Sequence, residues 1–257
     1  MTQDLTGQVA IVTGGSDGIG LATAALLVRR GAKVVICGRR QEQLDIASAH
    51  VEADGGTVEA VQLDVTDFEA FEALIQDVAA RHGRLDMLVN NAMSVHYAPI
   101  SKLTLDHWRK DFAVNTEAVF VGTKAAMAVM AKQGKGSIVN ISSTTGIRAM
   151  ANYASYSASK AALIQFTAVA AMEGALQGIR VNAIVPGQVN TAATADFAIK
   201  APELASKTAG AIPMGRGGKP EELAEAIVFM LSDAASYITG VALPVDGGKS
   251  AQLYIPS

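Results

Sequence analysis

The stretch "IVTGGSDGIGLATA" (residues 11–24) decides the fold, because it has the pattern of a strand, a glycine-rich turn and the start of a helix. Gly14, Gly18 and Gly20 remove Cβ atoms where the backbone must turn and where a pyrophosphate could approach. The free N–H groups at the start of the following helix would bind that anion. A glycine-rich turn can also be purely structural, but its place between a first strand and a helix favours dinucleotide binding.

Working outward from this turn, short β-branched runs alternate with longer segments rich in Ala and Leu. Near-continuous apolar strands are typical of a parallel sheet that is covered on both faces. We therefore expect an α/β fold, a doubly wound, seven-stranded parallel sheet of Rossmann-like type, in a single domain over residues 1–257. The expected strands are residues 8–14, 32–38, 57–65, 85–92, 136–143, 179–187 and 241–248.

Helix boundaries and one irregular segment can also be predicted. Asp67 and Thr104 are expected N-caps, and Gly31 and Gly83 are expected C-caps. Residues 188–219 interrupt the regular alternation with a long segment of small residues after the sixth strand. Because ligands bind at the carboxyl ends of parallel strands, we interpret this segment as a lid over a bound substrate.

The composition excludes several classes of protein. The 257 residues carry a net charge of −3, which gives no electrostatic reason to expect nucleic acid or an anionic membrane as a partner. The polar N-terminus has no signal-peptide pattern, and no apolar run approaches about 18 residues, so a cytoplasmic protein is expected. Cys37 lies in an apolar run and the four histidines lack metal-ligand spacing, so no metal site is expected.

The glycine-rich turn and seven further motifs follow one another in an order that resembles the short-chain dehydrogenase/reductase family. They are "TGGSDGIG" (13–20), "LDV" (63–65), "NNA" (90–92), Asn115, "ISS" (141–143), "YSASK" (156–160), "PGQVNT" (186–191) and "DGG" (246–248). The resemblance covers nearly the whole chain and implies a nicotinamide-dependent oxidoreductase. The chain departs from the family at Met93, where a glycine is usual, and this side chain would crowd the nicotinamide or the substrate.

Two tyrosines compete for the role of catalytic acid, because both Tyr153 and Tyr156 precede Lys160 at helical spacing. Ser143 precedes Tyr156 by thirteen positions, the spacing of ketone-reducing members of the family. The spacing from Tyr153 to Lys160 resembles enoyl reductases, which usually carry a serine where this chain has Gly20. Tyr156 is therefore the predicted catalytic residue, and Tyr153 is expected at the substrate mouth or at a subunit contact.

The resemblance implies a role for each of four catalytic residues. Tyr156 is the general acid in reduction and the base in oxidation, with a pKa well below that of a free tyrosine. Lys160 lowers that pKa and binds the nicotinamide ribose, and Ser143 polarises the carbonyl. Asn115 holds a helix irregularity and a water that links Lys160 to solvent.

The resemblance also assigns cofactor contacts. Asp64 and Val65 are expected at the adenine and Asn91 at the ribose, while Asn90 is expected to tie neighbouring strands together. The full predicted set is Gly14, Ser16, Asp17, Gly18, Ile19, Arg39, Asp64, Val65, Asn91, Tyr156, Lys160, Pro186, Gly187, Val189 and Thr191.

The end of the second strand favours NADP(H) over NAD(H). Enzymes specific for NAD usually place an acid there to accept from the ribose 2′-hydroxyl, and this chain has Gly38. Arg39, with Arg40 beside it, could clamp a 2′-phosphate. Asp17 argues against this, because an acid facing the phosphate would repel it. We expect Asp17 to turn to solvent, and NAD(H) stays an alternative.

The expected substrate is an uncharged, hydrophobic or cyclic ketone or the matching alcohol, because the residues around the lid are small and apolar. They are Ala192, Ala193, Ala195, Phe197 and Ile199, with Met93, Val95 and Met150 nearby. A β-ketoacyl thioester reductase and a catalytically silent dinucleotide-binding regulator are the alternatives, although a regulator would be expected to have lost Ser143, Tyr156 or Lys160.

A homo-oligomer, most simply a tetramer, is expected from two apolar helices. The helix over residues 153–177 is rich in alanines that permit close approach of a second helix. The helix over residues 104–133 carries Trp108, Phe112, Val119, Phe120, Met127 and Met130.

Overall fold

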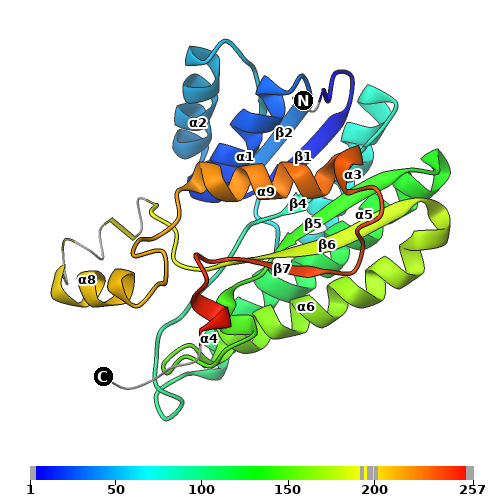
Figure 1. Cartoon of the computed structure of the whole chain (residues 1–257). Coiled ribbons are helices and arrows are strands. Elements are labelled where there is room, and N and C mark those ends of the chain that lie inside the picture. The colour runs from blue at the N-terminus through cyan, green and yellow to red at the C-terminus, as the bar shows by residue number, and fades with distance from the viewer. Residues whose placement is uncertain (1–3, 192–193, 196–198, 200–201, 253–257) are drawn as a thin grey trace.

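The computed structural model describes residues 4–191, 194–195, 199 and 202–252, and it shows one twisted parallel sheet between two layers of helices (Figure 1). The strand order is β3-β2-β1-β4-β5-β6-β7, so the order reverses between β1 and β4. The expected doubly wound fold is confirmed. The strands are β1 Val9–Thr13, β2 Lys33–Gly38, β3 Glu59–Gln62, β4 Met87–Asn90, β5 Gly136–Ile141, β6 Ile179–Pro186 and β7 Ala242–Val245.

The helices cover both faces of the sheet, with α1 and α9 on one side and α3, α5 and α6 on the other (Figure 1). Each layer buries its own apolar cluster against the strands. Ligands bind in such folds at the carboxyl ends of the strands, where the order reverses. The helices are α1 Gly18–Arg29, α2 Gln41–Ala53, α3 Phe68–His82, α4 Leu105–Phe112, α5 Ala118–Gln133, α6 Ala154–Gly174, α8 Pro202–Gly210 and α9 Pro220–Leu231.

The predicted helix ends agree well with the structure. The carboxylate of Asp67 accepts from the N–H of Ala70, and the hydroxyl of Thr104 accepts from the N–H of His107, so both N-caps are confirmed. Gly83 ends α3 with a left-handed φ of 73°. Gly31, also left-handed, follows Arg30, the residue that caps α1.

All seven strands are shorter than predicted, and one predicted helix is interrupted. The third strand covers four residues and not 57–65, because it lies at the sheet edge with a single neighbouring strand. The fifth strand ends at Ile141, two residues before Ser143. The helix expected over 104–133 is divided into α4 and α5 by the π-helical turn η1 (Ala113–Glu117).

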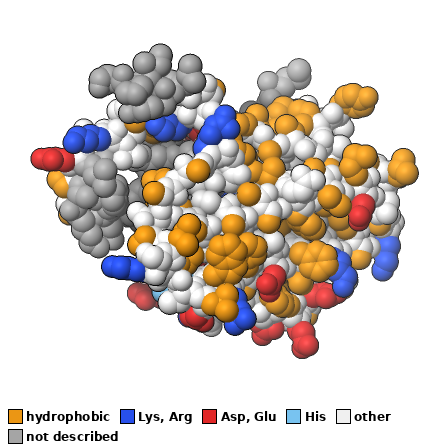
Figure 2. Space-filling model, turned by 90° about the horizontal axis from the view of Figure 1, so that it is seen from below, with side chains coloured by type: hydrophobic (Ala, Val, Ile, Leu, Met, Phe, Trp, Pro, Cys, Tyr) orange, Lys and Arg blue, Asp and Glu red, His pale blue; other side chains and the backbone are white. Residues whose placement is uncertain are grey.

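Some apolar residues predicted to face a partner subunit are core residues of this chain. Met130 is buried in the cluster beneath the sheet, and Val119 is also buried. Phe120 is 51% exposed, and Met172 and Leu176 on and after α6 are more exposed still. Figure 2, which views the molecule from below, shows apolar side chains gathered on the outer surface.

No helix in the described ranges is both long and apolar enough to cross a membrane.

Buried amides connect the central strands to the helices beneath them. The amide of Asn90 donates to the Oδ1 of Asn140 at 2.8 Å and to the hydroxyl of Thr123 at 3.3 Å. Asn140 in turn donates to the hydroxyl of Thr167 on α6 at 2.9 Å. The role predicted for Asn90, to tie neighbouring strands together, is therefore confirmed.

Replacing Asn140 with alanine should destabilise the protein, because it removes the acceptor for Asn90 and the donor to Thr167. A buried group left without its partner costs about 1–3 kcal/mol of unfolding free energy. Urea unfolding at fixed protein concentration measures this loss, with the exposed Thr57→Ala as the control. Equal midpoints for the two variants would contradict the structural role of Asn140.

Candidate active site

Ser143, Tyr156 and Lys160 lie together at the carboxyl edge of the sheet. Ser143 follows β5 and caps the 3-10 turn η2 (Thr144–Gly146), while Tyr156 and Lys160 lie one turn apart on α6. The hydroxyl of Ser143 lies near enough to that of Tyr156 to favour its phenolate and act to lower its pKa. The amine of Lys160 lies 5.7 Å from the centroid of the Tyr156 ring. The structure therefore brings the three predicted catalytic side chains together.

Burial dominates the ionisation of this cluster. Removal from water raises the pKa of Tyr156 to about 12, although the nearby hydroxyl of Ser143 acts in the opposite direction. Burial lowers the pKa of Lys160 to about 7, and its amine donates to the carbonyl of Ile141 at 2.7 Å. This differs from the expectation that Lys160 brings the pKa of Tyr156 well below its free value. In the protein alone the amine is itself desolvated and is directed to a backbone carbonyl.

Asn115 lies in the π-helical turn η1 and is wholly buried. Its Oδ1 accepts from the N–H of Ser94, and its Nδ2 donates to the carbonyl of Ser94 and to the hydroxyl of Ser159. The helix irregularity that the family resemblance implied is present at this residue. These contacts of its amide are all with protein groups, so its role in proton transfer stays a prediction.

Tyr153 caps the N-terminus of α6 at the mouth of this cluster and is half-buried. Its ring lies edge-on to Tyr97 at 4.8 Å and to Tyr156 at 6.2 Å between centroids. Its hydroxyl pairs with that of Tyr97, and burial raises its pKa to about 12. The ring of Tyr153 therefore contacts other tyrosines, as a residue that lines the substrate mouth could, and is not paired with Lys160 as Tyr156 is.

The glycine-rich turn is held by Asn91. Its amide donates to the carbonyls of Thr13 and Gly14, both at 3.0 Å. Asn91 was predicted at the cofactor ribose, but in the structure its amide nitrogen supports the turn. A Cβ on Gly20 would lie 2.2 Å from the carbonyl oxygen of Gly14, so only glycine lets α1 approach the turn this closely.

The surroundings of the turn fit a dinucleotide. A Cβ on Gly18 would lie 3.0 Å from the Cγ2 of Thr191, so the segment predicted at the nicotinamide reaches the turn. Asp17 accepts from the N–H of Gly18 at 2.7 Å and thereby caps α1. Asp17 is exposed to solvent, and its carboxylate at the same time satisfies the first N–H of the helix. Glycine at Gly18 and Gly20 thus permits close packing of the turn, and the remaining N–H groups at the start of α1 could bind an anion.

The residues predicted at the adenosine lie near the ends of β2 and β3. A Cβ on Gly38 would lie 3.4 Å from the Oγ of Ser16, so these residues face each other at the end of β2. Arg39 is exposed and forms no ion pair with a described residue. Asp64 accepts from the N–H and hydroxyl of Thr66, so its carboxylate stabilises a local turn.

The other predicted contacts take several positions. Val65 and Val189 are buried, and Ile19 packs against the core cluster of α1 and α9. Pro186 ends β6, and Gly187 packs so closely on Asp246 that a Cβ would lie 2.8 Å from the Cβ of Asp246.

The segment over residues 188–219 is closed at its base. Val189 and Gly218 form a β-bridge, with a backbone bond from Gly218 to Gln188 at 2.9 Å. Helix α8 lies within the segment. Ala195 and Ile199 are exposed, whereas Ala192, Ala193 and Phe197 lie outside the described residues.

Met93 and Met150, predicted near the substrate, are both about half exposed, at 55% and 53%. Neither is therefore locked in the core, and the crowding expected at Met93 stays a prediction.

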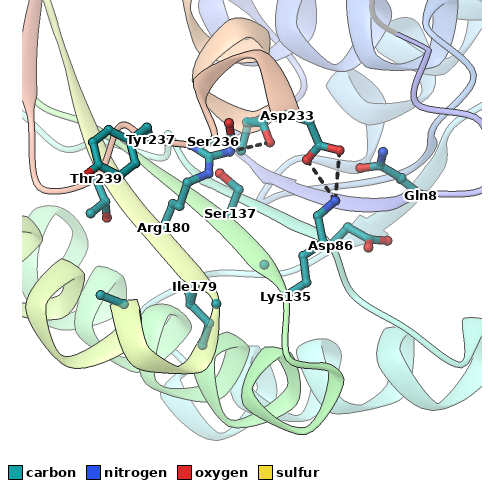
Figure 3. A pocket seen from close by; sticks show the side chains of 14 residues that line it. Gln8, Asp86, Lys135, Ser137, Ile179, Arg180, Asp233, Ser236, Tyr237 and Thr239 are labelled. Carbon is teal, nitrogen blue, oxygen red and sulfur yellow. Dashed lines mark hydrogen bonds and ion pairs between the residues drawn. The ribbon is translucent and has the colours of Figure 1, made fainter.

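A cavity of about 550 Å³ opens at the opposite edge of the sheet (Figure 3). Two of its positively charged groups already have partners. The guanidinium of Arg180 donates to four backbone carbonyls at and after the end of α9, and Lys135 is paired with Asp233. We therefore place the candidate active site at the carboxyl edge.

Sequence analysis missed one buried residue beside the site, Asp111 on α4. Its carboxylate accepts from the hydroxyls of Ser94 and Ser155 and from both the ring and the backbone of His96. The available signal was its spacing of four residues before Asn115, which places both side chains on one helix face.

Replacing Lys160 with methionine should change how stability depends on pH. Since the folded pKa lies near 7 and the free value is 10.5, the unfolded chain binds the proton more readily between these values. The stability contributed by the neutral amine is therefore lost as the pH falls from about 10 to 7. As the pH falls over this range, urea unfolding of the cofactor-free proteins should show the free energy of unfolding of Lys160→Met rising relative to that of the native protein.

The exposed Lys124→Met is the control and should follow the native protein. A stability difference between Lys160→Met and the native protein that stays constant with pH would show that burial of the amine is not the cause.

Comparison with known proteins gives consistent results. A family model described as "Enoyl-(Acyl carrier protein) reductase" matches residues 14–250. A 2,5-dichloro-2,5-cyclohexadiene-1,4-diol dehydrogenase of Sphingobium indicum is 41% identical over 250 residues, covering 97% of this chain and 99% of the relative. A cis-4-hydroxycyclohexanecarboxylate dehydrogenase of Sinomonas cyclohexanicum is 42% identical over 245 residues, covering 95% and 97%.

A 3-oxoacyl-[acyl-carrier-protein] reductase of Thermotoga maritima is 40% identical over 245 residues, covering 95% of this chain and 98% of the relative. Among solved structures, a protein from Beutenbergia cavernae with NADP at low occupancy superposes with a TM-score of 0.92. It is 38% identical, and the match covers 98% of this chain and 100% of that one.

Proposed function

The chain belongs to the short-chain dehydrogenase/reductase family and is an alcohol dehydrogenase/ketoreductase of that NAD(P)-binding family, and from this premise we propose its substrate, mechanism and cofactor. It interconverts a cyclic secondary alcohol and the corresponding ketone, with Tyr156 as general acid and base. The observation that carries the proposal is the cluster of Ser143, Tyr156 and Lys160 at the carboxyl edge of the sheet.

Each side chain has a distinct part in this mechanism. When bound, the nicotinamide cofactor supplies or accepts the hydride. In reduction the hydroxyl of Tyr156 gives its proton to the carbonyl oxygen, and the hydroxyl of Ser143 stabilises the negative charge that develops there. Burial keeps Tyr156 protonated in the free protein, which suits an acid. Oxidation needs the phenolate, so alcohol oxidation is expected to accelerate as the pH rises.

The substrate class is supported by two relatives that are named for reactions on cyclic alcohols. The residues at the site agree with a ring, because Met93, Tyr97 and Met150 expose apolar surface. The Thermotoga maritima relative supports the alternative, a β-ketoacyl thioester reductase. Comparing kcat/KM for cyclohexanols and cyclopentanols with that for acyl thioesters separates the two. A preference for thioesters would overturn the cyclic-alcohol proposal.

We also propose that residues 188–219 form a lid on a single domain and that the protein assembles as a tetramer. The bridge between Val189 and Gly218 supports a lid that moves as one segment, because it joins the two ends. Exposed Phe120, Met172 and Leu176 support subunit contacts on the helical surface.

Replacing Tyr156 with phenylalanine should abolish nearly all turnover, since a general acid contributes about 10²–10⁴-fold. Cofactor affinity should stay within a few-fold, because the ring remains. Steady-state rates and fluorescence titration with the reduced cofactor measure these two quantities. Tyr153→Phe is the matched control and should be mild. The opposite result, a crippling Tyr153→Phe and a mild Tyr156→Phe, would favour an enoyl reductase.

We propose that NADP(H) is the preferred cofactor, because of the end of β2. Gly38 presents no acid to a ribose 2′-hydroxyl, and the hydroxyl of Ser16 faces the space that its side chain would occupy. Arg39 has no described acidic partner and could bind a 2′-phosphate. Asp17 is committed to the N–H of Gly18, which fixes its negative charge at the turn and partly opposes this preference.

The Gly38→Asp, Arg39→Leu double variant should reverse the cofactor preference. The native protein should have the higher kcat/KM with NADP(H). The double variant should have the higher kcat/KM with NAD(H), since its new carboxylate would repel a 2′-phosphate and accept from a 2′-hydroxyl. Lys33→Leu, at the exposed opposite end of β2, is the control and should keep the native order. A native protein that prefers NAD(H), or an unchanged order in the double variant, would show that this strand end does not set the preference.

A further inference from the structure

Two hydrogen-bonded connections link the helix that carries Asn115 to the helix that carries the candidate catalytic pair. Asp111 and Asn115 are four residues apart, and so are Ser155 and Ser159 on α6. The amide of Asn115 donates to the hydroxyl of Ser159 at 3.0 Å. The hydroxyl of Ser155 donates to the carboxylate of Asp111 at 2.5 Å. One connection joins α4 to α6 and the other joins the adjacent turn η1 to α6, four residues further along each segment.

The two serines on α6 immediately precede the two candidate catalytic residues. Ser159 precedes Lys160, and Ser155 precedes Tyr156. The connection through Asn115 therefore fixes the backbone at Lys160, and the connection through Asp111 fixes it at Tyr156. Ser94 joins the two, because its backbone is bound to Asn115 and its hydroxyl donates to Asp111 at 2.8 Å.

The carboxylate of Asp111 is fully buried, with 0% of its surface exposed. A buried charge is costly unless it is hydrogen-bonded, and Asp111 accepts from four donors. Besides the two serine hydroxyls, these are the N–H of His96 and the Nδ1 of its ring, at 3.2 and 2.7 Å. The ring of His96 stacks on that of His107, with centroids 4.3 Å apart. Every acceptor position of this carboxylate is thus engaged around the start of α6.

We propose that Asp111 is a positioning residue that holds Tyr156 in place and acts on its ionisation through its own negative charge. The inference rests on the proposed role of Tyr156 as acid and base. In this inference the bond from Ser155 to Asp111 positions Tyr156, as the bond from Asn115 to Ser159 positions Lys160.

The electrostatic part follows from the sign of the charge. A buried negative charge near a phenol disfavours the phenolate. Asp111 acts in this direction on the pKa of Tyr156, after the larger effects of burial, Tyr97 and Tyr153. Titratable groups face the pair from every neighbouring element. Those around Tyr156 are Tyr97, Tyr153 and Lys160, and those around Asp111 are His96 and, behind it, His107.

The Asp111→Asn variant tests both parts, because it keeps the shape of the side chain and removes the charge. We expect kcat for alcohol oxidation to fall about 10- to 100-fold, since a small misplacement of a reacting group has an effect of this order. KM for the cofactor should stay within a few-fold. The pH at which oxidation reaches half its maximal rate should move to a lower value. Substrate deuterated at the carbinol carbon identifies the conditions in which hydride transfer limits the rate.

Two further variants make the result specific. Ser155→Ala removes the hydrogen bond but not the charge, so kcat should fall while the pH of half-maximal rate does not decrease. Asp106→Asn is the matched control on the same helix. Its carboxylate is largely exposed and paired with Lys110, so the variant should have native kinetics.

The outcomes separate this inference from the proposed function. An active Tyr156→Phe overturns the proposed function, and the inference with it. If Tyr156→Phe is inactive but Asp111→Asn matches Asp106→Asn in both kcat and pH dependence, the inference alone is overturned. A reduced kcat without a shift of the pH profile overturns its electrostatic part and leaves only the positioning. If Asp111→Asn does not fold, Ser155→Ala decides, and a native kcat in that variant overturns the positioning.

Discussion

The site depends on removing the amine of Lys160 from water. Its Nζ donates to the carbonyl of Ile141 at the end of β5, so α6 must lie directly against that strand end. The backbone confirms how close the approach is, because a Cβ on Gly146 would lie 3.0 Å from the carbonyl group of Lys160. The hydroxyl of Ser142 donates to the same carbonyl at 2.9 Å. The amine and the backbone carbonyl of Lys160 together therefore hold the strand end and the turn η2 against the helix that carries Tyr156.

The same burial explains why a simple rule about tyrosine and lysine fails in the free protein. The rule assumes a full ammonium that favours the phenolate. Here both groups are desolvated, so the neutral form of each is stabilised. The pKa of Tyr156 is therefore raised above its free value, and the pKa of Lys160 is lowered below its free value. The nearby hydroxyl of Ser143 makes the main favourable contribution to the phenolate from the protein itself. Additional positive charge at the site would have to come from what binds there.

Local sequence patterns predicted the sheet, the caps at Asp67 and Thr104, and the link through Asn90, because each depends on neighbouring residues or on strand periodicity. The third strand was too long, since the pattern does not show that an edge strand loses its second partner. Asp111 was missed for a different reason. Helical spacing shows that Asp111 and Asn115 share a face, but not that this face meets Ser155 and Ser159 on a helix forty residues away. That contact is a property of tertiary packing.

The two edges of the sheet differ in what their polar groups have left to offer. At the amino edge the guanidinium of Arg180 is saturated by backbone carbonyls, and Lys135 is paired with Asp233. Because these groups are already paired within the protein, they have few hydrogen bonds left to offer a ligand in the cavity beside them. At the carboxyl edge Arg39 has no described acidic partner, and Ser143 lies close enough to Tyr156 to act on its pKa. Ligand binding requires polar groups that are held in place but still have hydrogen-bonding capacity left. At the carboxyl edge, Asn115 and Asp111 make their hydrogen bonds within the protein. They thereby hold Lys160 and Tyr156 in place for a ligand, which favours this edge as the active site.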